Sequence, residues 1–249
     1  MDAIISARGI QKSFGNHKAL RNIDLELFKG ESVAIFGPNG AGKTTLLKVL
    51  STIITPTKGD VTVNGTDVKK NPSSVREMVG VISHETYLYD ELTARENLKF
   101  FGNMYGLEKS RLEERINELL EQVGLNQRAD DRVGSFSRGM KQRLSIARAL
   151  VHRPVILFMD EPYTGLDHQS AEAFENVLKI LDRDNVTKIM VSHNIERAMH
   201  LCDRLLVMDR GEIVYDRMKE EIESLEDFKV NYSSLVCMDT DAEGVSNLP

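Results

Sequence analysis

The sequence predicts an α/β fold in which short strands alternate with helices around a parallel sheet. Apolar runs with the length of buried strands occur at 31–36, 155–160 and 188–192. Helical periodicity follows the first two of these runs, at 44–50 and 171–181. Because strands joined through a helix pair in parallel, this rhythm predicts a parallel sheet that is covered by helices.

The N-terminal part of the chain has a different pattern. Residues 1–35 alternate short apolar stretches with the turn signals Phe14-Gly15-Asn16 and Lys29-Gly30. A further strand signal at 61–63 is followed by Asn64-Gly65. We therefore expect a small β-rich layer beside the parallel sheet.

A helical insertion is predicted between about residues 90 and 150. Two sequences there have the form of capping boxes, Thr93-x-x-Glu96 and Ser110-x-x-Glu113, and each precedes an apolar pattern with helical period. This insertion lies between strand signals of the α/β region, so its helices are expected to lie inside one α/β domain rather than after it.

Bulk composition excludes several classes of protein. The chain has 249 residues, 41% of them hydrophobic and 28% charged, which is enough to fold as one large domain or two packed subdomains. A formal net charge of −6 gives no general attraction to nucleic acid. Cys202 and Cys237 lack the spacing of a disulfide framework or zinc site, which fits a reducing cytosol. No secretory signal is visible, and the longest apolar run, 155–159, is far shorter than the ~20 residues that cross a bilayer.

A glycine-rich motif joins the strand at 31–36 to the helix at 44–50. It consists of Gly37, Pro38, Asn39, Gly40, Ala41, Gly42, Lys43, Thr44 and Thr45. In the pattern G-x-x-x-x-G-K-[ST], backbone N–H groups surround phosphates, the lysine neutralises β/γ charge and the hydroxyl is a ligand of Mg²⁺. The helix N-terminus that follows also favours an anion, so the motif predicts a nucleotide phosphate site.

Three side chains at predicted strand ends fit chemistry at such a phosphate. Asp160 can hold Mg²⁺ directly or through water, and Glu161 can orient or deprotonate an attacking water. His193 can donate a hydrogen bond to a γ-phosphate; the alternative is a strand-end histidine with a structural role. Ligands of doubly wound sheets bind at one edge where strands end, which favours the functional interpretation.

With these motifs in this order, the chain resembles the nucleotide-binding subunits of ATP-binding-cassette transporters over about residues 3–217. The resemblance implies a P-loop NTPase (RecA-like) core, a flanking antiparallel β subdomain and an inserted α-helical signature subdomain. It also implies one ATPase domain over 1–218, with its helical subdomain at about 86–150. Residues 219–249 are then expected to form a short C-terminal helix and a flexible tail.

The same resemblance implies roles for individual residues. Residues 37–45 correspond to the Walker A loop, 136–140 to the signature loop and 164–167, with Asp167, to the D-loop. Asp160 corresponds to the Walker B aspartate, Glu161 to the catalytic base and His193 to the switch histidine. Phe14 corresponds to the aromatic residue that stacks on adenine. For Phe14 the alternative is a core residue at a strand end.

Ser137 is expected to act in one of two ways. Its hydroxyl fits the N-cap of the helix that follows. In the resembled family this hydroxyl and the Gly139 N–H instead contact the γ-phosphate held by a second subunit, so that two chains enclose two ATP molecules. Phe136, Arg138 and Met140 depart from the commonest Leu-Ser-Gly-Gly-Gln form of this loop, which leaves the role of its glutamine open.

His84 is a second departure from the family pattern. The family usually has a glutamine there. Because Mg²⁺ prefers oxygen ligands, the His84 imidazole is expected to act on the ion through a water rather than directly. The segment Tyr87-Leu88-Tyr89 lies where the family receives a membrane subunit, so it is expected either to form a docking socket or to cover the helical insertion.

The resemblance further implies ATP and Mg²⁺ as cofactors, a second nucleotide-binding subunit in a homodimer, and transmembrane permease subunits that dock near Tyr87–Tyr89 on the cytoplasmic face of the cell membrane. No nucleic acid is expected. An exporter is favoured, and the runs at 83–98 and 161–167 are similar to the ATPase of the haem exporter of cytochrome c maturation. The alternative class is a soluble single-cassette ATPase that drives assembly of another complex; a P-loop kinase is disfavoured by Ser137-Arg138-Gly139.

Overall fold

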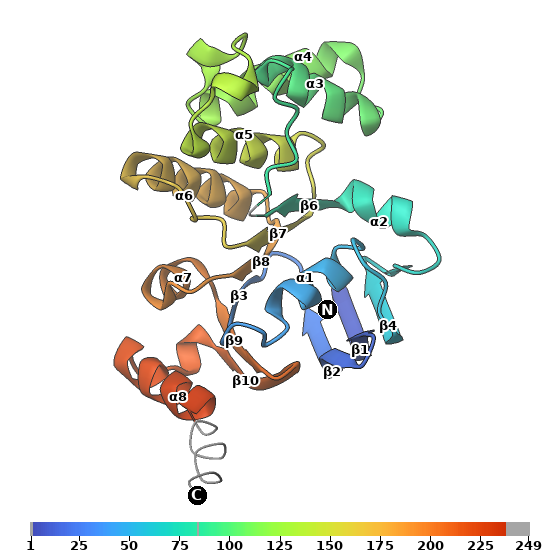
Figure 1. The fold of residues 1–249 in the computed structure, drawn as a ribbon, viewed down its shortest axis with the longest axis vertical. Coiled ribbons are helices and arrows are strands. Elements are labelled where there is room, and N and C mark those ends of the chain that lie inside the picture. The colour runs from blue at the N-terminus through green and yellow to red at the C-terminus, as the bar shows by residue number, and fades with distance from the viewer. Residues whose placement is uncertain (1, 84, 238–249) are drawn as a thin grey trace, which may run out of the picture. The chain divides into compact units, whose positions relative to one another are not determined.

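The computed structural model describes residues 2–83 and 85–237 and divides the chain into two compact units (Figure 1). The first unit comprises the chain up to Leu27, Glu31–Lys69 and the chain from Ile189 onward. The second comprises Phe28–Gly30 and Lys70–Lys188. Each unit has its own hydrogen-bonded strands and its own helices.

The first unit contains the strands β1 (Ile5–Phe14), β2 (His17–Leu27), β3 (Ser32–Phe36), β4 (Lys58–Val63), β5 (Thr66–Asp67), β9 (Arg204–Asp209) and β10 (Glu212–Met218) and the helices α1 (Lys43–Leu50), α7 (Ile195–Leu201) and α8 (Leu225–Cys237). The second unit contains β6 (Val79–Ile82) and β7 (Ile156–Asp160) with the helices α2 (Pro72–Met78), α3 (Ala94–Met104), α4 (Lys109–Gln122), α5 (Arg138–Leu150) and α6 (His168–Arg183). Strand β8 (Thr187–Val191) begins in the second unit and ends in the first.

Two sheets order the strands of the first unit. The antiparallel sheet β2-β1-β4-β5 is the β-rich layer that the sequence predicts. In the other sheet the order is β10-β9-β3-β8, and β3 runs parallel to β9. The sheet is not wholly parallel, because β10 pairs antiparallel with β9. The cause is local: Arg210 and Gly211 both have positive φ, 45° and 84°, which forms a tight hairpin turn.

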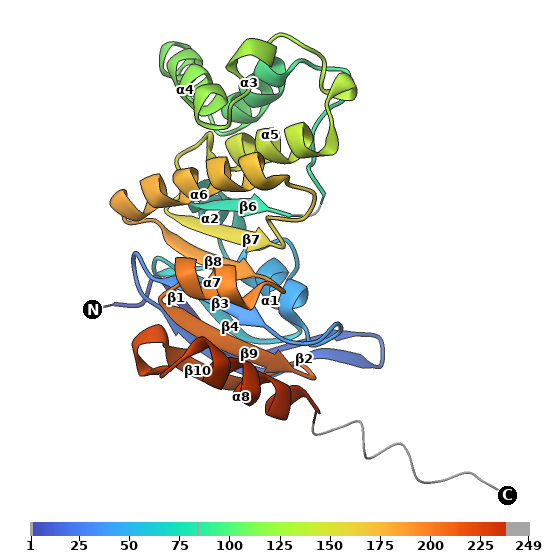
Figure 2. The ribbon, with the colours of Figure 1, turned by 90° about the vertical axis from the view of Figure 1, so that its left-hand side faces the viewer.

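The C-terminal helix α8 packs against strands of its own unit, the first. Phe228 is fully buried, and its ring lies 5.4 Å from Phe36 of β3 and 5.6 Å from Tyr215 of β10. Within residues 219–249, where a short C-terminal helix and a flexible tail are expected, Lys219–Glu221 form one 3-10 turn and α8 runs from Leu225 to Cys237 (Figure 2). The rest of the expected tail lies outside the described residues.

The helical insertion of the second unit is confirmed. At the start of α3, the Thr93 Oγ1 accepts a hydrogen bond from the Glu96 N–H at 3.1 Å and the Glu96 side chain accepts one from the Thr93 N–H at 2.9 Å, which is the predicted capping box. The second predicted capping box is wrong. Helix α4 already includes Ser110, and the Ser110 hydroxyl donates to the Glu108 carboxylate at 3.0 Å instead of capping the helix.

His152 is packed inside the second unit. The Tyr105 ring stacks on the His152 ring with 3.8 Å between their centroids, and Nε2 of His152 lies 3.0 Å from the Val79 carbonyl oxygen. Because a carbonyl only accepts, Nε2 carries the proton and donates it. Burial lowers the pKa of His152 from 6.5 to about 4, with the nearby guanidinium of Arg148 acting in the same direction.

This pKa shift predicts that the unfolding free energy falls as the solution becomes acidic. The unfolded chain takes up a proton on His152 below pH 6.5, whereas the folded chain does so only near pH 4. The stabilisation is therefore complete above pH 6.5 and is lost as the pH falls toward 4. Between pH 7.5 and 4.5 we expect the unfolding free energy of His152→Gln to fall by about 2 kcal/mol less than that of the wild type. Chemical denaturation at the two pH values measures this difference. The control is His17→Gln, at the exposed first position of β2, which should keep the wild-type pH dependence.

Among the described residues, no helix combines the length and the apolar character that are needed to cross a membrane.

Candidate functional site

The glycine-rich motif forms a tight loop between β3 and α1 in the first unit. All five residues of β3 are buried, so the strand delivers Gly37 at a fixed point. Gly37 has φ 144°, and a Cβ there would lie 2.1 Å from the Met208 carbonyl oxygen. Gly42, the N-cap of α1, has φ 101°, and a Cβ there would lie 2.5 Å from the Ala19 carbonyl oxygen. Only glycine satisfies both backbone requirements, and the loop closes around backbone N–H groups that suit phosphate oxygens.

Lys43 places its ammonium within this loop. Its Nζ donates to the Gly37 carbonyl oxygen at 2.7 Å and to the Pro38 carbonyl oxygen at 2.9 Å, and the residue is 7% exposed. The loop is held from outside by the Gly211 N–H, which donates to the Ala41 carbonyl oxygen at 2.9 Å. The charge that would neutralise β/γ-phosphate oxygens is thus already positioned at the start of α1, where the helix dipole adds to it.

His193 lies beyond the end of β8, the strand next to β3 in the sheet order. The Ser192 N–H donates to the Ile35 carbonyl oxygen at 3.4 Å, so the chain reaches His193 alongside the strand that leads into the phosphate loop. The residue after it, Asn194, caps α7 by accepting from the Arg197 N–H. His193 itself is exposed, as a phosphate contact requires. The structure therefore places Lys43 and His193 in the same unit.

Phe14 ends β1 with its ring 52% exposed, which differs from the alternative of a core residue. Two contacts fix this strand end. The Lys12 Nζ donates to the Thr55 carbonyl oxygen at 2.7 Å and lies 5.1 Å from the Phe14 ring centroid, and the Ser13 N–H donates to the Thr57 hydroxyl at 3.0 Å. One face of the ring is thus backed by a cation, an arrangement that leaves an aromatic surface available for stacking.

The two carboxylates follow β7 in the second unit. Asp160 is its last residue and is partly exposed, whereas the strand before it is buried. Glu161 has φ 51°, in the left-handed region, and its carbonyl oxygen accepts from the Thr164 N–H at 3.1 Å. A non-glycine residue in this conformation costs of order 1 kcal/mol or more and is common at functional sites.

The signature and D-loop segments lie side by side in the second unit. The Ser137 side chain accepts from the Met140 N–H at 3.3 Å and caps α5, which confirms the capping interpretation. A Cβ on Gly139 would lie 3.6 Å from the Gly165 carbonyl oxygen. Asp167 caps α6 by accepting from the Ser170 N–H at 2.8 Å, and these Ser170 hydrogen bonds lower the pKa of Asp167. Ser137 remains exposed, so the cap does not prevent a contact with another molecule.

Gln142 is a supporting residue that the motif search misses. It lies on α5, is 4% exposed, and its Nε2 donates to the Pro162 carbonyl oxygen at 3.3 Å. This bond ties the helix that starts at Ser137 to the loop that follows Glu161. The available signal was a polar side chain on the buried face of α5, one turn before Ile146. Phe136 also has a structural explanation, because its side chain is buried where the common signature has leucine.

The residues predicted to bind Mg²⁺ carry the oxygen donors that this ion prefers, a hydroxyl on Thr44 in the first unit and a carboxylate on Asp160 in the second. Within residues 2–83 and 85–237, no three His, Cys, Asp or Glu side chains gather as an all-protein metal site. His84 lies outside the described residues.

Comparisons with known proteins agree with this chemistry. A family model described as "ABC transporter" matches residues 20–164. The chain is 42% identical over 217 residues to the ABC transporter ATP-binding protein NatA of Bacillus subtilis (strain 168), covering 86% of this chain and 88% of that one. It is 40% identical over 211 residues to the linearmycin resistance ATP-binding protein LnrL of the same organism, covering 85% and 68%.

Solved structures have the same fold. An ATP-binding subunit of an ABC transporter superposes with a TM-score of 0.86 at 26% identity, covering 92% of this chain and 99% of the other. A dimeric post-hydrolysis state of an ATP-binding cassette bound to ADP and Pi gives 0.80 at 26% identity, covering 88% and 100%. The fold is thus that of an ABC ATPase, with an α/β core and mixed sheets. The chain belongs to the ABC transporter family, as the ATP-binding and ATP-hydrolysing subunit that powers transport.

Proposed function

We propose that this ATPase powers an exporter of a small organic molecule. The observation that carries the proposal is the combination of a preformed phosphate loop with an exposed aromatic surface suited to a permease. The similarity to proteins named for linearmycin resistance, Nod factor export and daunorubicin resistance supports export as the direction. In this proposal the subunit is held at the cytoplasmic face of the membrane by its permease partner.

The proposed catalytic cycle uses residues of both units. The phosphate loop and Lys43 bind the β- and γ-phosphates of ATP, Phe14 stacks on adenine, and Thr44 and Asp160 hold Mg²⁺. Mg²⁺, when bound there, would polarise the phosphoryl group and stabilise the negative charge on the phosphate oxygens. His193 donates a hydrogen bond to the γ-phosphate and orients it.

Glu161 is the proposed general base. Its carboxylate accepts a proton from the attacking water, whose oxygen bonds to the γ-phosphorus while the bond from that phosphorus to the β–γ bridging oxygen breaks. The products are ADP and inorganic phosphate. Ser137 and Gly139 are proposed to contact the γ-phosphate held by a second copy of the chain, with Asp167 of the D-loop beside them, so hydrolysis removes a contact between the two copies and allows them to separate.

The proposed permease site is the aromatic face, defined here as Tyr87, Tyr89, Phe100 and Met104. These side chains are 55%, 48%, 40% and 67% exposed, which is unusual for neighbouring large apolar groups. The Tyr89 and Phe100 rings meet edge to face at 4.9 Å. Tyr89 thus also packs on the helical insertion, as the alternative expectation for this segment has it, while docking of a permease is the proposal.

Contacts from the helical insertion hold Tyr87 and Tyr89 of the aromatic face. The Tyr89 N–H donates to the Asn97 side-chain oxygen at 2.9 Å, and the Asn97 amide donates to the Tyr89 carbonyl oxygen at 3.0 Å. The Arg148 guanidinium lies 5.8 Å from the Tyr87 ring centroid. Because these contacts limit the entropy lost on binding, the face suits an apolar helix or loop of a membrane subunit.

The test is a pull-down from detergent-solubilised native membranes. We expect the wild-type chain to retain a multi-span membrane protein and the double variant Tyr87→Ala, Tyr89→Ala to lose it, while the ATPase rate of the isolated chain stays within about twofold of wild type. Val230→Ala, 69% exposed on α8, is the matched control and should retain the partner. Recovery of soluble partners alone would contradict the transporter assignment and favour the assembly ATPase.

Haem export for cytochrome c maturation remains the narrower candidate that the runs at 83–98 and 161–167 favour. The same purified complex separates it from export of other molecules. Haem absorption in the complex, together with haem-handling companions, supports haem export. Stimulation of its ATPase by daunorubicin without haem absorption supports export of an amphipathic organic molecule.

A further inference from the structure

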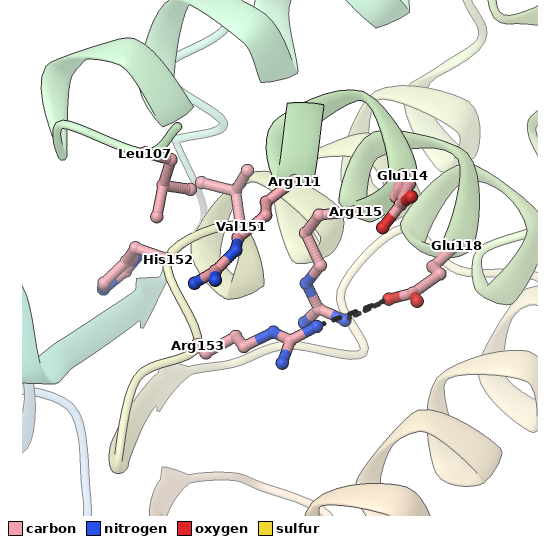
Figure 3. Close-up of a pocket in the computed structure, with 8 residues that line it drawn as sticks. All are labelled: Leu107, Arg111, Glu114, Arg115, Glu118, Val151, His152 and Arg153. Atoms are coloured by element: carbon pink, nitrogen blue, oxygen red, sulfur yellow. Dashed lines mark hydrogen bonds and ion pairs between the residues drawn. The ribbon is translucent and has the colours of Figure 1, made fainter. Parts of the chain in front are cut away.

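A cavity of about 410 Å³ lies within the second unit (Figure 3). It is lined by Leu107, Arg111, Glu114, Arg115, Glu118, Val151, His152 and Arg153. Helix α4 and the segment after α5 supply most of this lining. The volume is in the range of small-molecule sites, and its lining combines two apolar side chains with three arginines.

Arg115 is the deepest cation of the cavity. Its Nη2 donates to the Leu150 carbonyl oxygen at 3.0 Å and its Nη1 to the Glu118 carboxylate at 3.1 Å, and its side chain is only 16% exposed. Its Nε is buried and has no hydrogen-bond partner among the residues that the structure describes. A guanidinium has five N–H donors, and a buried donor left without an acceptor is costly. The Nη atoms of Arg115 carry four N–H groups, and the Leu150 and Glu118 hydrogen bonds use two of them, so N–H donors are left for an oxygen ligand in the cavity.

Glu118 does not neutralise this part of the cavity. The same carboxylate oxygen that pairs with Arg115 also lies 3.9 Å from Nη2 of Arg153. One negative charge is thus shared by two guanidinium groups, and Figure 3 shows both ion pairs meeting at the Glu118 carboxylate. Arg111 pairs with Glu108 at 3.6 Å, and Glu114, which also lines the cavity, is exposed to solvent, where its charge is screened.

Arg153 is held in an uncommon backbone conformation. Its φ is 55°, and its N–H donates to the Leu150 carbonyl oxygen at 3.1 Å, so the chain turns sharply after α5. Asparagine or glycine adopts this conformation at lower cost than arginine. A second cavity of about 500 Å³ in the same unit is also lined by Arg115, Glu118 and Arg153 and adds Lys29. The arginine pair thus borders both hollows.

We propose that the cavity bordered by Arg115 and Arg153 binds the phosphate group of a small soluble phosphate ester. Planar guanidinium groups match phosphate oxygens with paired hydrogen bonds, and two of them with one shared carboxylate leave a net positive site for such a group. Leu107 and Val151 supply an apolar wall for the carbon part of the ester. None of the lining residues is assigned to ATP, so the ester binds without displacing the nucleotide.

Calorimetric titration of the full chain with glycerol 3-phosphate tests this proposal, with saturating Mg-ADP present so that the phosphate loop is filled. We expect saturable binding that weakens as salt rises. Arg153→Gln should raise the dissociation constant about tenfold, and Arg153→Lys should restore part of the loss because it keeps the charge without the planar fork. Arg153 is 73% exposed, so these variants are expected to fold.

Arg8→Gln is the matched control, because Arg8 is a comparably exposed arginine that pairs with Glu26 in the first unit. It should leave the affinity unchanged. Arg115→Gln should abolish binding if its circular dichroism spectrum matches that of the wild type. Absence of saturable binding, or an affinity that Arg153→Gln does not change, overturns the proposal. Binding confined to vesicles that contain phosphatidic acid overturns the soluble ester as ligand and assigns the site to a lipid headgroup.

Discussion

Replacing Glu161 with glutamine is expected to lower the rate of ATP turnover by ~10²–10⁴-fold, the usual contribution of a positioned general base. The amide keeps the size of the side chain and fits the same left-handed backbone turn at φ 51°, so the fold and the phosphate loop should be unaffected. ATP affinity should therefore change by less than about threefold. The measurement is steady-state phosphate release together with equilibrium binding of ATP.

Glu172→Gln is the matched control for this result. Glu172 is an exposed carboxylate on α6, a few residues beyond the D-loop, and has no assigned role in the chemistry. Its amide variant should turn over at the wild-type rate. Normal turnover in Glu161→Gln would remove Glu161 from the role of base and would require another group to activate water.

Replacing Lys43 with alanine is expected to weaken ATP binding by ~10²–10³-fold, because truncating a buried, hydrogen-bonded charge costs about 2–5 kcal/mol. The variant removes both Nζ contacts to the Gly37 and Pro38 carbonyl oxygens, so the loop loses its cation and part of its shape. Binding is measured by titration with ATP in the presence of Mg²⁺.

Lys48→Ala provides the comparison within the same helix. Lys48 lies on the exposed side of α1, and its loss changes the net charge of the chain by the same amount. It should leave ATP affinity nearly unchanged. Equal effects of the two substitutions would show that general charge, rather than the position of Lys43 in the loop, governs binding.

The sequence predicted those parts of the structure that depend on local signals. The strand at 32–36, the glycine loop and α1 follow directly from an apolar run, a phosphate motif and helical periodicity. The capping box at Thr93 was also correct, because both of its side chains are free to form it. The capping box predicted at Ser110 was wrong, because Ser110 lies inside α4 and its hydroxyl donates to the Glu108 carboxylate.

Features that depend on distant parts of the chain were not predicted. The packing of α8 depends on burial of Phe228 against Phe36 of β3, which is far away in sequence. The Gln142 contact with Pro162 and the arginine cavity likewise join segments that no short pattern links. Packing between remote segments decides such features, and a single sequence carries little information about it.

The central claim is that ATP joins two copies of this chain into a working pair. Light scattering on size-exclusion chromatography of Glu161→Gln tests it directly, with Mg-ATP or Mg-ADP in the buffer. The account predicts twice the 28.1 kDa of one chain with ATP, one chain with ADP, and one chain with ATP when Ser137→Arg is added to block the contact in trans. The same mass in all three samples would contradict it.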